Sequence, residues 1–193
     1  MVSLQRQGCH NINLVTPSHV VPQILKSLSI AADQGLCIPI VYNSGGYDAI
    51  DTLMLLEDVV DIYMPDAKYG SEEIARLLSH APDYVITMKA AIREMHRQVG
   101  DLVIDEGIAV RGMIIRHLVL PENLAGSNKV LPWIAEEISC DSYVNIMEQY
   151  HPAWHTTGIE KGSLPSSLWR RITPGEYHFA ILIARDSGLH RVF

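Results

Sequence analysis

The sequence predicts an α/β protein built on a parallel sheet of about five strands. Short apolar runs rich in β-branched and aromatic residues alternate with longer segments of helical periodicity. Several of the short runs end at a proline or a polar cluster, which is typical of buried parallel strands that reach a ligand site. No repeat or change of composition marks a second domain, so residues 1–193 are expected to form one domain. The pattern leaves open whether the sheet curls into a partial barrel.

Helices and strands alternate through the first part of the chain. The expected order is a helix end at residues 1–7, a strand at 11–15, a helix at 20–34, a strand at 38–42, a helix at 48–57 and a strand within 59–68. Gly8 and Gly35 stand where the first two helical patterns end, and Pro17 stops the first strand. These signals give two complete strand–helix units followed by a third strand.

The same alternation continues to the end of the chain. The expected order is helices from 71 and over 84–98, a strand within 109–121, a helix at 128–139, a strand at 143–150, a loop at 153–171 and a closing helix from 174 to about 188. Glu72 and Glu73 favour a helix start because acidic side chains are stabilised in a first turn. Pro174 suits the first turn of the closing helix.

The run from Val59 to Lys68 is the most informative stretch. It is too short and too rich in β-branched residues for a helix, it stops at Pro65, and it delivers an acid, Asp66, and a base, Lys68, two positions apart. The other expected strand ends carry Thr16, Ser18, His19, Asn43, Ser44, Gly45, Gly46, Arg116, His117 and His151.

Collected at one edge of a sheet, these groups would suit an anionic or zwitterionic small molecule. Arg116 or Lys68 can hold a carboxylate, and Asp66 can accept an ammonium or a hydroxyl group. The glycines after the second strand offer backbone N–H groups. The alternatives are a solvated Asp66–Lys68 ion pair, a surface charge at Arg116 and an ordinary loop histidine at His151.

Composition narrows the classes of function. The chain is 48% hydrophobic with a net charge of −7, which favours a folded domain and argues against a nucleic-acid surface. No apolar stretch approaches about 20 residues, so a membrane segment is not expected. We expect a cytoplasmic location. Cys9, Cys37 and Cys140 are too far apart for a local metal site, and we expect them to be reduced and mostly buried, with Cys37 in the core.

Four segments carry a family resemblance: residues 8–20 (GCHNINLVTPSHV), 41–47 (VYNSGGY), 61–69 (DIYMPDAKY) and 116–121 (RHLVLP). In this order they resemble the radical S-adenosylmethionine (SAM) superfamily, in particular homologues of pyruvate formate-lyase activating enzyme. The resemblance implies a partial (β/α) barrel and a [4Fe-4S] cluster that cleaves SAM reductively. It also implies a glycyl-radical enzyme or another protein substrate as the partner.

The resemblance also implies SAM-binding positions at the strand ends. Thr16 and Ser18 stand where the superfamily contacts the SAM amino group, and Asn43 and Ser44 follow at the next strand end. Asp66 and Lys68 resemble the Asp-x-Lys strand end that lies near the SAM carboxylate in activating enzymes. Arg116 and His151 complete the set of expected cofactor-binding residues. No catalytic residue is assigned.

The chain departs from the family at its cluster loop. Members hold the cluster with a Cys-x₃-Cys-x₂-Cys loop after the first strand, and no such motif occurs here. The chain therefore resembles the family without its first strand and cluster-binding loop, and no cluster or other metal is expected on this chain alone. A missing N-terminal segment or another chain would have to supply the cluster. The strand at 11–15 would then have an unpaired edge, so we expect marginal stability or self-association through it.

Three functional hypotheses follow. The first is the C-terminal portion of a radical SAM activating enzyme, inactive by itself. The second is a metal-free α/β-barrel enzyme of the lyase or aldolase type, in which Lys68 acts with Asp66 and His151. The third is a non-catalytic domain that binds SAM or a partner protein.

Overall fold

The structure is a computed structural model that describes residues 1–152 and 164–193. Its helices are α1 (Val2–Arg6), α2 (Val21–Asp33), α3 (Ile50–Met54), α4 (Glu72–Ser79), α5 (Tyr84–Val99), α6 (Ser127–Glu137) and α7 (Pro174–Asp186). Its strands are β1 (Ile12–Val15), β2 (Ile40–Ser44), β3 (Ile62–Pro65), β4 (Val103–Asp105), β5 (Ile108–Leu118), β6 (Tyr143–Met147) and β7 (Arg191–Val192). Short 3-10 turns are η1 (Ser18–Val20), η2 (Pro121–Asn123) and η4 (Ser166–Trp169).

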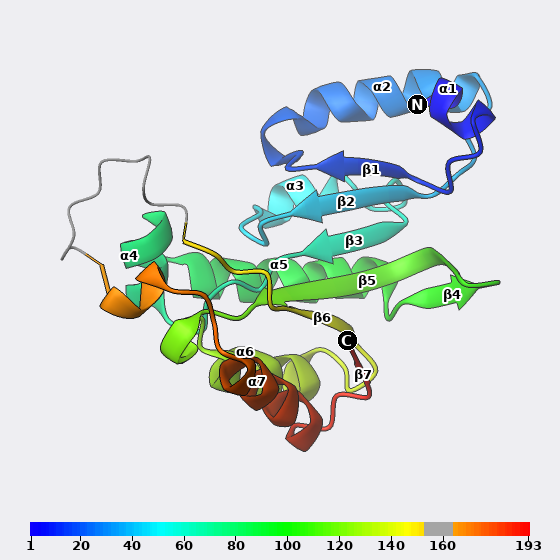
Figure 1. Cartoon of the computed structure of the whole chain (residues 1–193). Coiled ribbons are helices and arrows are strands. Elements are labelled where there is room, and N and C mark those ends of the chain that lie inside the picture. Colours follow the sequence, from blue (N-terminus) through cyan, green and yellow to red (C-terminus); the bar gives the residue numbers. More distant parts are fainter. Residues whose placement is uncertain (153–163) are drawn as a thin grey trace. The chain divides into compact units, whose positions relative to one another are not determined.

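The strands form a mostly parallel sheet of seven strands in the order β1-β2-β3-β5-β6-β7, with β4 paired to β5 (Figure 1). The pairs β1–β2, β2–β3, β3–β5 and β6–β7 are parallel, and β4–β5 is antiparallel. The sheet is not closed, because β1 and β7 end the strand order. The predicted α/β fold with a parallel sheet is confirmed.

The described chain divides into two compact units. The first unit contains Met1–Pro65 and Thr87–Ile114, and the second contains Asp66–Ile86 and Ile115–Phe193. Strand β5 and helix α5 contribute residues to both units. The prediction of a single domain stays a prediction.

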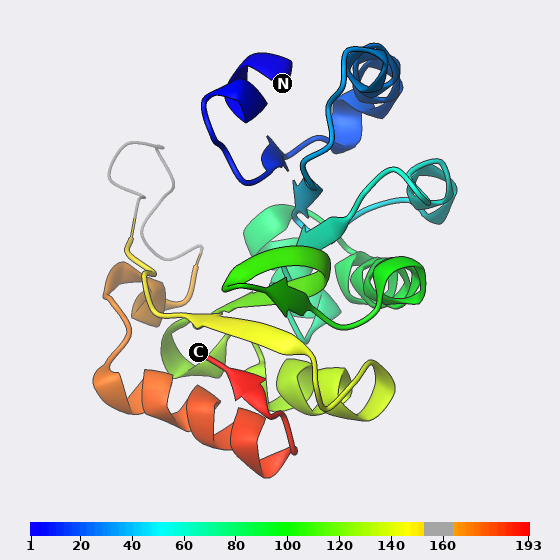
Figure 2. The ribbon, with the colours of Figure 1, turned by 90° about the vertical axis from the view of Figure 1, so that its right-hand side faces the viewer.

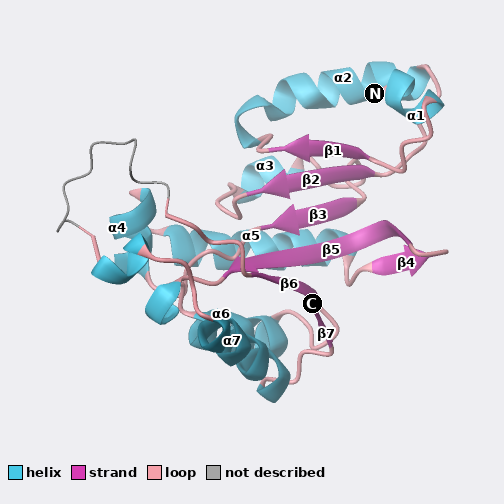
Figure 3. Ribbon diagram, viewed as in Figure 1, coloured by secondary structure: helices cyan, strands magenta, loops and turns pink. Residues whose placement is uncertain are grey.

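In the first unit, β1, β2 and β3 run side by side in the same direction (Figure 3). All five residues of β2 are buried, as expected for a central strand with both faces covered. Leu28 of α2 packs with Ile12 and Ile40 in an apolar cluster on one face. Tyr42 and Tyr63 are fully buried and meet edge to face, with ring centroids 5.7 Å apart.

In the second unit, β7 lies alongside β6, and α6 and α7 lie next to each other (Figure 2). Helix α7 starts with a capping box, because the Thr173 side chain accepts the Glu176 N–H while the Glu176 carboxylate accepts the Thr173 N–H. Glu176 also holds Arg170 through two bonds of 2.8 and 2.7 Å and accepts the N–H of Glu122. Helix α7 is therefore anchored at its start, and Pro174 lies in its first turn as predicted.

Two strands, β4 and β7, were not expected from the sequence. Strand β4 forms a hairpin with β5 around Glu106 and Gly107, whose φ angles are positive, at 47° and 83°. Gly112 allows β5 to approach the backbone of Asp101 closely, because a Cβ at position 112 would lie 2.4 Å from the carbonyl oxygen of Asp101. Strand β7 has only two residues. The predicted loop at 153–171 contains η4, and its first part, 153–163, lies outside the described residues.

The predicted burial of the cysteines is wrong. Cys9, Cys37 and Cys140 are free thiols, as expected, but all three are exposed. Cys37 lies in the connection before β2 rather than in the core, and its N–H donates to the Gln5 side chain at 2.8 Å. None of the helices in the described ranges is long and apolar enough to cross a membrane.

Candidate functional site

Asp66, Lys68 and Arg116 lie close together in the second unit. Asp66 and Lys68 directly follow the end of β3, and Arg116 lies on β5. Nη2 of Arg116 lies 2.6 Å from Oδ1 of Asp66, and both side chains are mostly shielded from solvent, at 25% and 17% exposure. Nζ of Lys68 lies 3.7 Å from Oδ2 of the same carboxylate and its side chain is 43% exposed. Asp66 therefore has a close cationic partner in Arg116 and a looser one in Lys68.

The backbone around Asp66 and Lys68 is held by hydrogen bonds on both sides. Asp66 and Arg116 form a parallel bridge, and the N–H of Ala67 donates to the carbonyl oxygen of Arg116 at 2.8 Å. The hydroxyl of Tyr84 donates to the Asp66 carbonyl oxygen at 2.8 Å and accepts the Lys68 N–H at 3.0 Å. The bridge continues the pairing as far as Asp66, and Tyr84 holds the main chain on both sides of Ala67.

Asp66 and Lys68 border a cavity of about 240 Å³ whose other walls are mostly apolar. It is lined by Asp66, Lys68, Tyr69, Leu118, Leu120 and Met147. Polar groups on one side and aliphatic side chains on the other are the usual composition of a small-molecule site. The volume lies below the range of about 300–1,000 Å³ found for whole drug-sized ligands, so the cavity suits a compact group such as an amino-acid moiety.

Four of the other expected binding residues lie in the first unit: Thr16, Ser18, Asn43 and Ser44. Thr16 directly follows β1 and has a positive φ of 53°, an unfavourable conformation for a β-branched residue. Its N–H donates to the carbonyl oxygen of Asn43 at 2.8 Å. Thr16 and Ser18 are exposed, whereas Asn43 is buried.

Ser44 belongs to a buried hydrogen-bond network that sequence reasoning missed. Its hydroxyl donates to Asp48 at 2.6 Å and accepts the Gly46 N–H, and the Tyr42 hydroxyl donates to the other Asp48 oxygen at 2.9 Å. Burial raises the pKa of Asp48 above its ordinary value, although the hydrogen bonds from Ser44 and Tyr42 oppose the shift. Ser44 therefore stabilises the turn after β2, and its hydroxyl is engaged.

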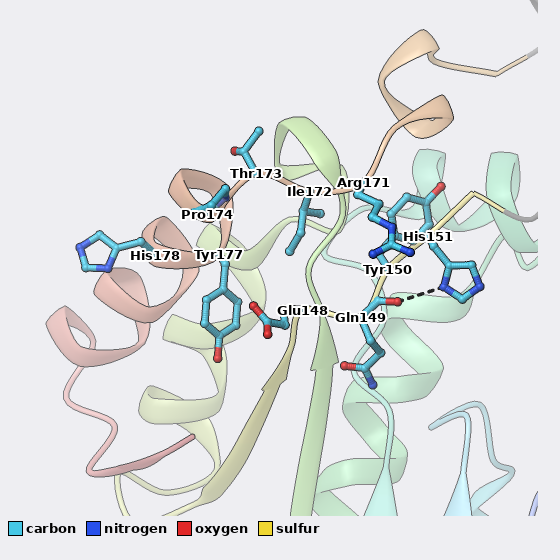
Figure 4. Close-up of a pocket in the computed structure, with 10 residues that line it drawn as sticks. All are labelled: Glu148, Gln149, Tyr150, His151, Arg171, Ile172, Thr173, Pro174, Tyr177 and His178. Atoms are coloured by element: carbon cyan, nitrogen blue, oxygen red, sulfur yellow. Dashed lines mark hydrogen bonds between the residues drawn. The ribbon is translucent and has the colours of Figure 1, made fainter.

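His151 lies in the second unit but lines a different and larger cavity of about 870 Å³ (Figure 4). This cavity lies between the end of β6 and the start of α7, and its walls include Glu148, Arg171 and Tyr177. His151 is exposed, and its Nδ1 lies 3.2 Å from the carbonyl oxygen of Gln149. The structure therefore does not bring His151 to the cavity of Asp66 and Lys68.

His117, beside Arg116 on β5, is fully buried. Its Nδ1 lies 2.7 Å from the Ala67 carbonyl oxygen, and its Nε2 lies 2.9 Å from the Ser127 hydroxyl. A carbonyl oxygen can only accept, so Nδ1 carries the proton and Nε2 accepts from Ser127 in the neutral ring. Burial lowers the pKa of His117, which favours this neutral form, while the bond to Ala67 opposes the shift. Its position next to Arg116 was the only sequence signal for this role.

The cysteines do not fit a cluster site. Cys9 follows α1, Cys37 follows α2 and Cys140 follows α6. Over residues 1–152 and 164–193 no group of three or more His, Cys, Asp or Glu side chains is arranged to hold a metal ion. The described residues therefore do not match the ligand set of a [4Fe-4S] cluster.

Comparison with known proteins places the fold. No protein-family model matches the chain. A domain of pyruvate-formate lyase-activating enzyme from Bacteroides vulgatus matches with a TM-score of 0.60 over 95% of this chain and 96% of that domain, at 13% sequence identity. The chain shares the fold of this domain. The predicted fold class, a partial barrel of the radical SAM type, is thereby confirmed at the level of architecture.

A sequence relative extends the comparison. An uncharacterized protein of Methanocaldococcus jannaschii is 30% identical over 196 residues, covering all of this chain and 51% of that protein. The chain thus spans about half the length of the curated relative that it matches.

Proposed function

We propose that this chain is part of a radical SAM protein related to pyruvate formate-lyase activating enzymes, and that its second unit binds the amino-acid end of SAM. One observation carries the proposal: an acid and a base, Asp66 and Lys68, border one compact cavity in a fold shared with an activating-enzyme domain. The SAM carboxylate would pair with Lys68 and the ammonium with Asp66. The apolar wall of Leu118, Leu120 and Met147 would take the methylene groups.

The charges favour Lys68 over Arg116 as the carboxylate partner. Arg116 is engaged by Asp66 at 2.6 Å, whereas Lys68 is 3.7 Å from the same carboxylate and more exposed. A zwitterionic ligand can therefore insert between Lys68 and Asp66 and form charge-assisted hydrogen bonds with both. Arg116 would keep the Asp66 carboxylate oriented toward the ligand.

The [4Fe-4S] cluster is not part of this proposal for the chain itself, because the described cysteines do not fit it. We propose that any cluster serving this protein is held by a separate segment or chain. A glycyl-radical enzyme or another protein substrate remains the proposed partner, by the sequence resemblance. A Schiff-base role for Lys68 is not favoured, because such lysines need desolvation and this side chain is 43% exposed beside a carboxylate.

The proposal is tested by titrating SAM into the chain in a calorimeter, with Lys68→Ala and a matched control. Losing one charge-assisted contact should weaken SAM binding by about ten- to a hundredfold. Lys26→Ala removes the same charge from an exposed position on α2 and should leave binding unchanged. The proposal is wrong if the wild-type chain does not bind SAM, or if the two variants bind equally well.

A further inference from the structure

We propose that Tyr84 and His117 are positioning residues that hold the segment Asp66–Lys68 so that its acid and its base face the ligand together. This inference rests on the proposed function of the site. Neither side chain lines the cavity itself. Each acts through a main-chain group of the residues that do line it, or of the residue between them.

Tyr84 holds the two ends of the segment. Its single hydroxyl donates to the carbonyl oxygen of Asp66 and accepts the N–H of Lys68, at 2.8 and 3.0 Å. The ring is fixed by an edge-to-face contact with Tyr69, with centroids 5.4 Å apart, and only 3% of Tyr84 is exposed. One buried hydroxyl thus sets the backbone on both sides of Ala67.

His117 and Arg116 hold the middle of the segment. Ala67 is fully buried, its N–H donates to the Arg116 carbonyl oxygen at 2.8 Å, and its carbonyl oxygen accepts from His117 at 2.7 Å. Ser127, at the start of α6, fixes the far side of the imidazole ring. The carbonyls of Asp66 and Ala67 and the N–H groups of Ala67 and Lys68 therefore all have protein partners.

This arrangement has a consequence for binding. Asp66 and Lys68 both line the cavity, whereas Ala67 between them is fully buried. This is the alternation of sides that an extended segment produces. The ion pair alone cannot secure this, because Lys68 is exposed and its contact with Asp66 is loose. A backbone fixed in advance reduces the ordering that a ligand must impose, which strengthens binding of the group that both side chains contact.

The first test compares Tyr84→Phe with Tyr150→Phe. Tyr150 donates to the carbonyl oxygen of Leu168 at 2.8 Å in the same unit, so its variant loses the same kind of bond away from the segment. SAM and 5′-methylthioadenosine, which lacks the amino-acid group, serve as ligands. We expect Tyr84→Phe to weaken SAM binding about three- to tenfold and to leave methylthioadenosine binding and the Tyr150→Phe control within about twofold. Equal losses for both ligands, or no loss for SAM, would overturn the positioning role.

The second test separates the two bonds of His117. Asn at this position places an amide where Nδ1 stands and can still donate to Ala67, whereas Gln reaches toward Ser127 instead. We expect His117→Asn to bind SAM more tightly than His117→Gln. The reverse order, or equal affinities in two folded variants, would contradict the assignment.

Amide hydrogen exchange keeps the inference separate from the proposed function. If the wild-type chain does not bind SAM, the proposed function fails, and the positioning role of Tyr84 is judged on amide exchange alone. The Lys68 amide should exchange faster in Tyr84→Phe than in the wild type, while the Ala67 amide, bonded to Arg116, stays protected. An unchanged Lys68 amide would refute the role of Tyr84.

Discussion

Replacing Arg116 by Met should cost much more stability than replacing Lys68 by Ala. Arg116 and Asp66 approach to 2.6 Å at 25% and 17% exposure, whereas Lys68 is 43% exposed and 3.7 Å from Asp66. Opposite charges about 4 Å apart attract by about 4 kcal/mol at an effective dielectric constant of about 20, and desolvation offsets part of this. We expect Arg116→Met to lower the free energy of unfolding by about 1–3 kcal/mol, because it leaves a shielded carboxylate without its close partner. Lys68→Ala should cost at most about 0.5 kcal/mol.

Urea unfolding at pH 7, followed by far-UV circular dichroism, measures both changes. Methionine keeps much of the length of the arginine side chain, so the loss reports mainly on the charge. Asp66→Asn supplies the control background: most of the Arg116→Met cost should vanish there, since the interaction is already broken. An undiminished cost in that background, or a Lys68→Ala cost as large as that of Arg116→Met, would refute the division of roles between the two cations.

Three further predictions concern the fold and the cluster. Hydrogen bonds from Arg170 hold the pKa of Glu176 well below its usual range. The ionised Glu176 carboxylate therefore stabilises the folded chain fully above about pH 4.3, and this contribution is lost as the pH falls below that value. The stability difference between wild type and Glu176→Gln should shrink on acidification, and a constant difference would contradict this. Anaerobic iron–sulfur reconstitution should yield no stoichiometric cluster on this chain alone; a cluster that forms and cleaves SAM would show that Cys9, Cys37 and Cys140 or a second subunit supply ligands. Strand β1 ends the strand order, so light scattering should detect self-association; a compact monomer over a wide concentration range would exclude it.

Much of the fold was predictable because its signals are local. Strand β3 ends at Pro65 and α7 begins at Pro174, as the sequence indicated. Strand β7 was missed because two residues carry no periodicity. Strand β4 was missed because three residues give too short a pattern, although Gly107 at the second position of a two-residue turn is typical of hairpins.

The error at Cys37 has a different physical cause. Leu36-Cys37-Ile38 is apolar, yet the strand begins only at Ile40, and Cys37 lies in an exposed connection. The N–H groups of Cys37 and Ile38 donate to the side chain of Gln5 on α1, which lies 32 and 33 residues earlier in the sequence. An apolar run shows that a segment favours burial, but tertiary contacts decide which of its residues is covered.

The site was predictable in part. The sequence named Asp66, Lys68 and Arg116 as candidates, and the structure adds that Arg116 and Asp66 form a close ion pair. Tyr84 was missed, and His117 was named only as a strand-end residue, because both act on the backbone of the segment, from α5 and β5. Main-chain hydrogen bonds from distant side chains leave no pattern in one sequence.

The most direct test of the account is the ratio of SAM to 5′-methylthioadenosine affinity, measured by calorimetry for the wild-type chain and for Lys68→Ala. The account predicts that the wild-type chain prefers SAM, because the amino-acid group reaches Asp66 and Lys68, and that Lys68→Ala removes most of this preference. A wild-type chain that binds both ligands equally, or neither, would contradict the assignment of this cavity to SAM.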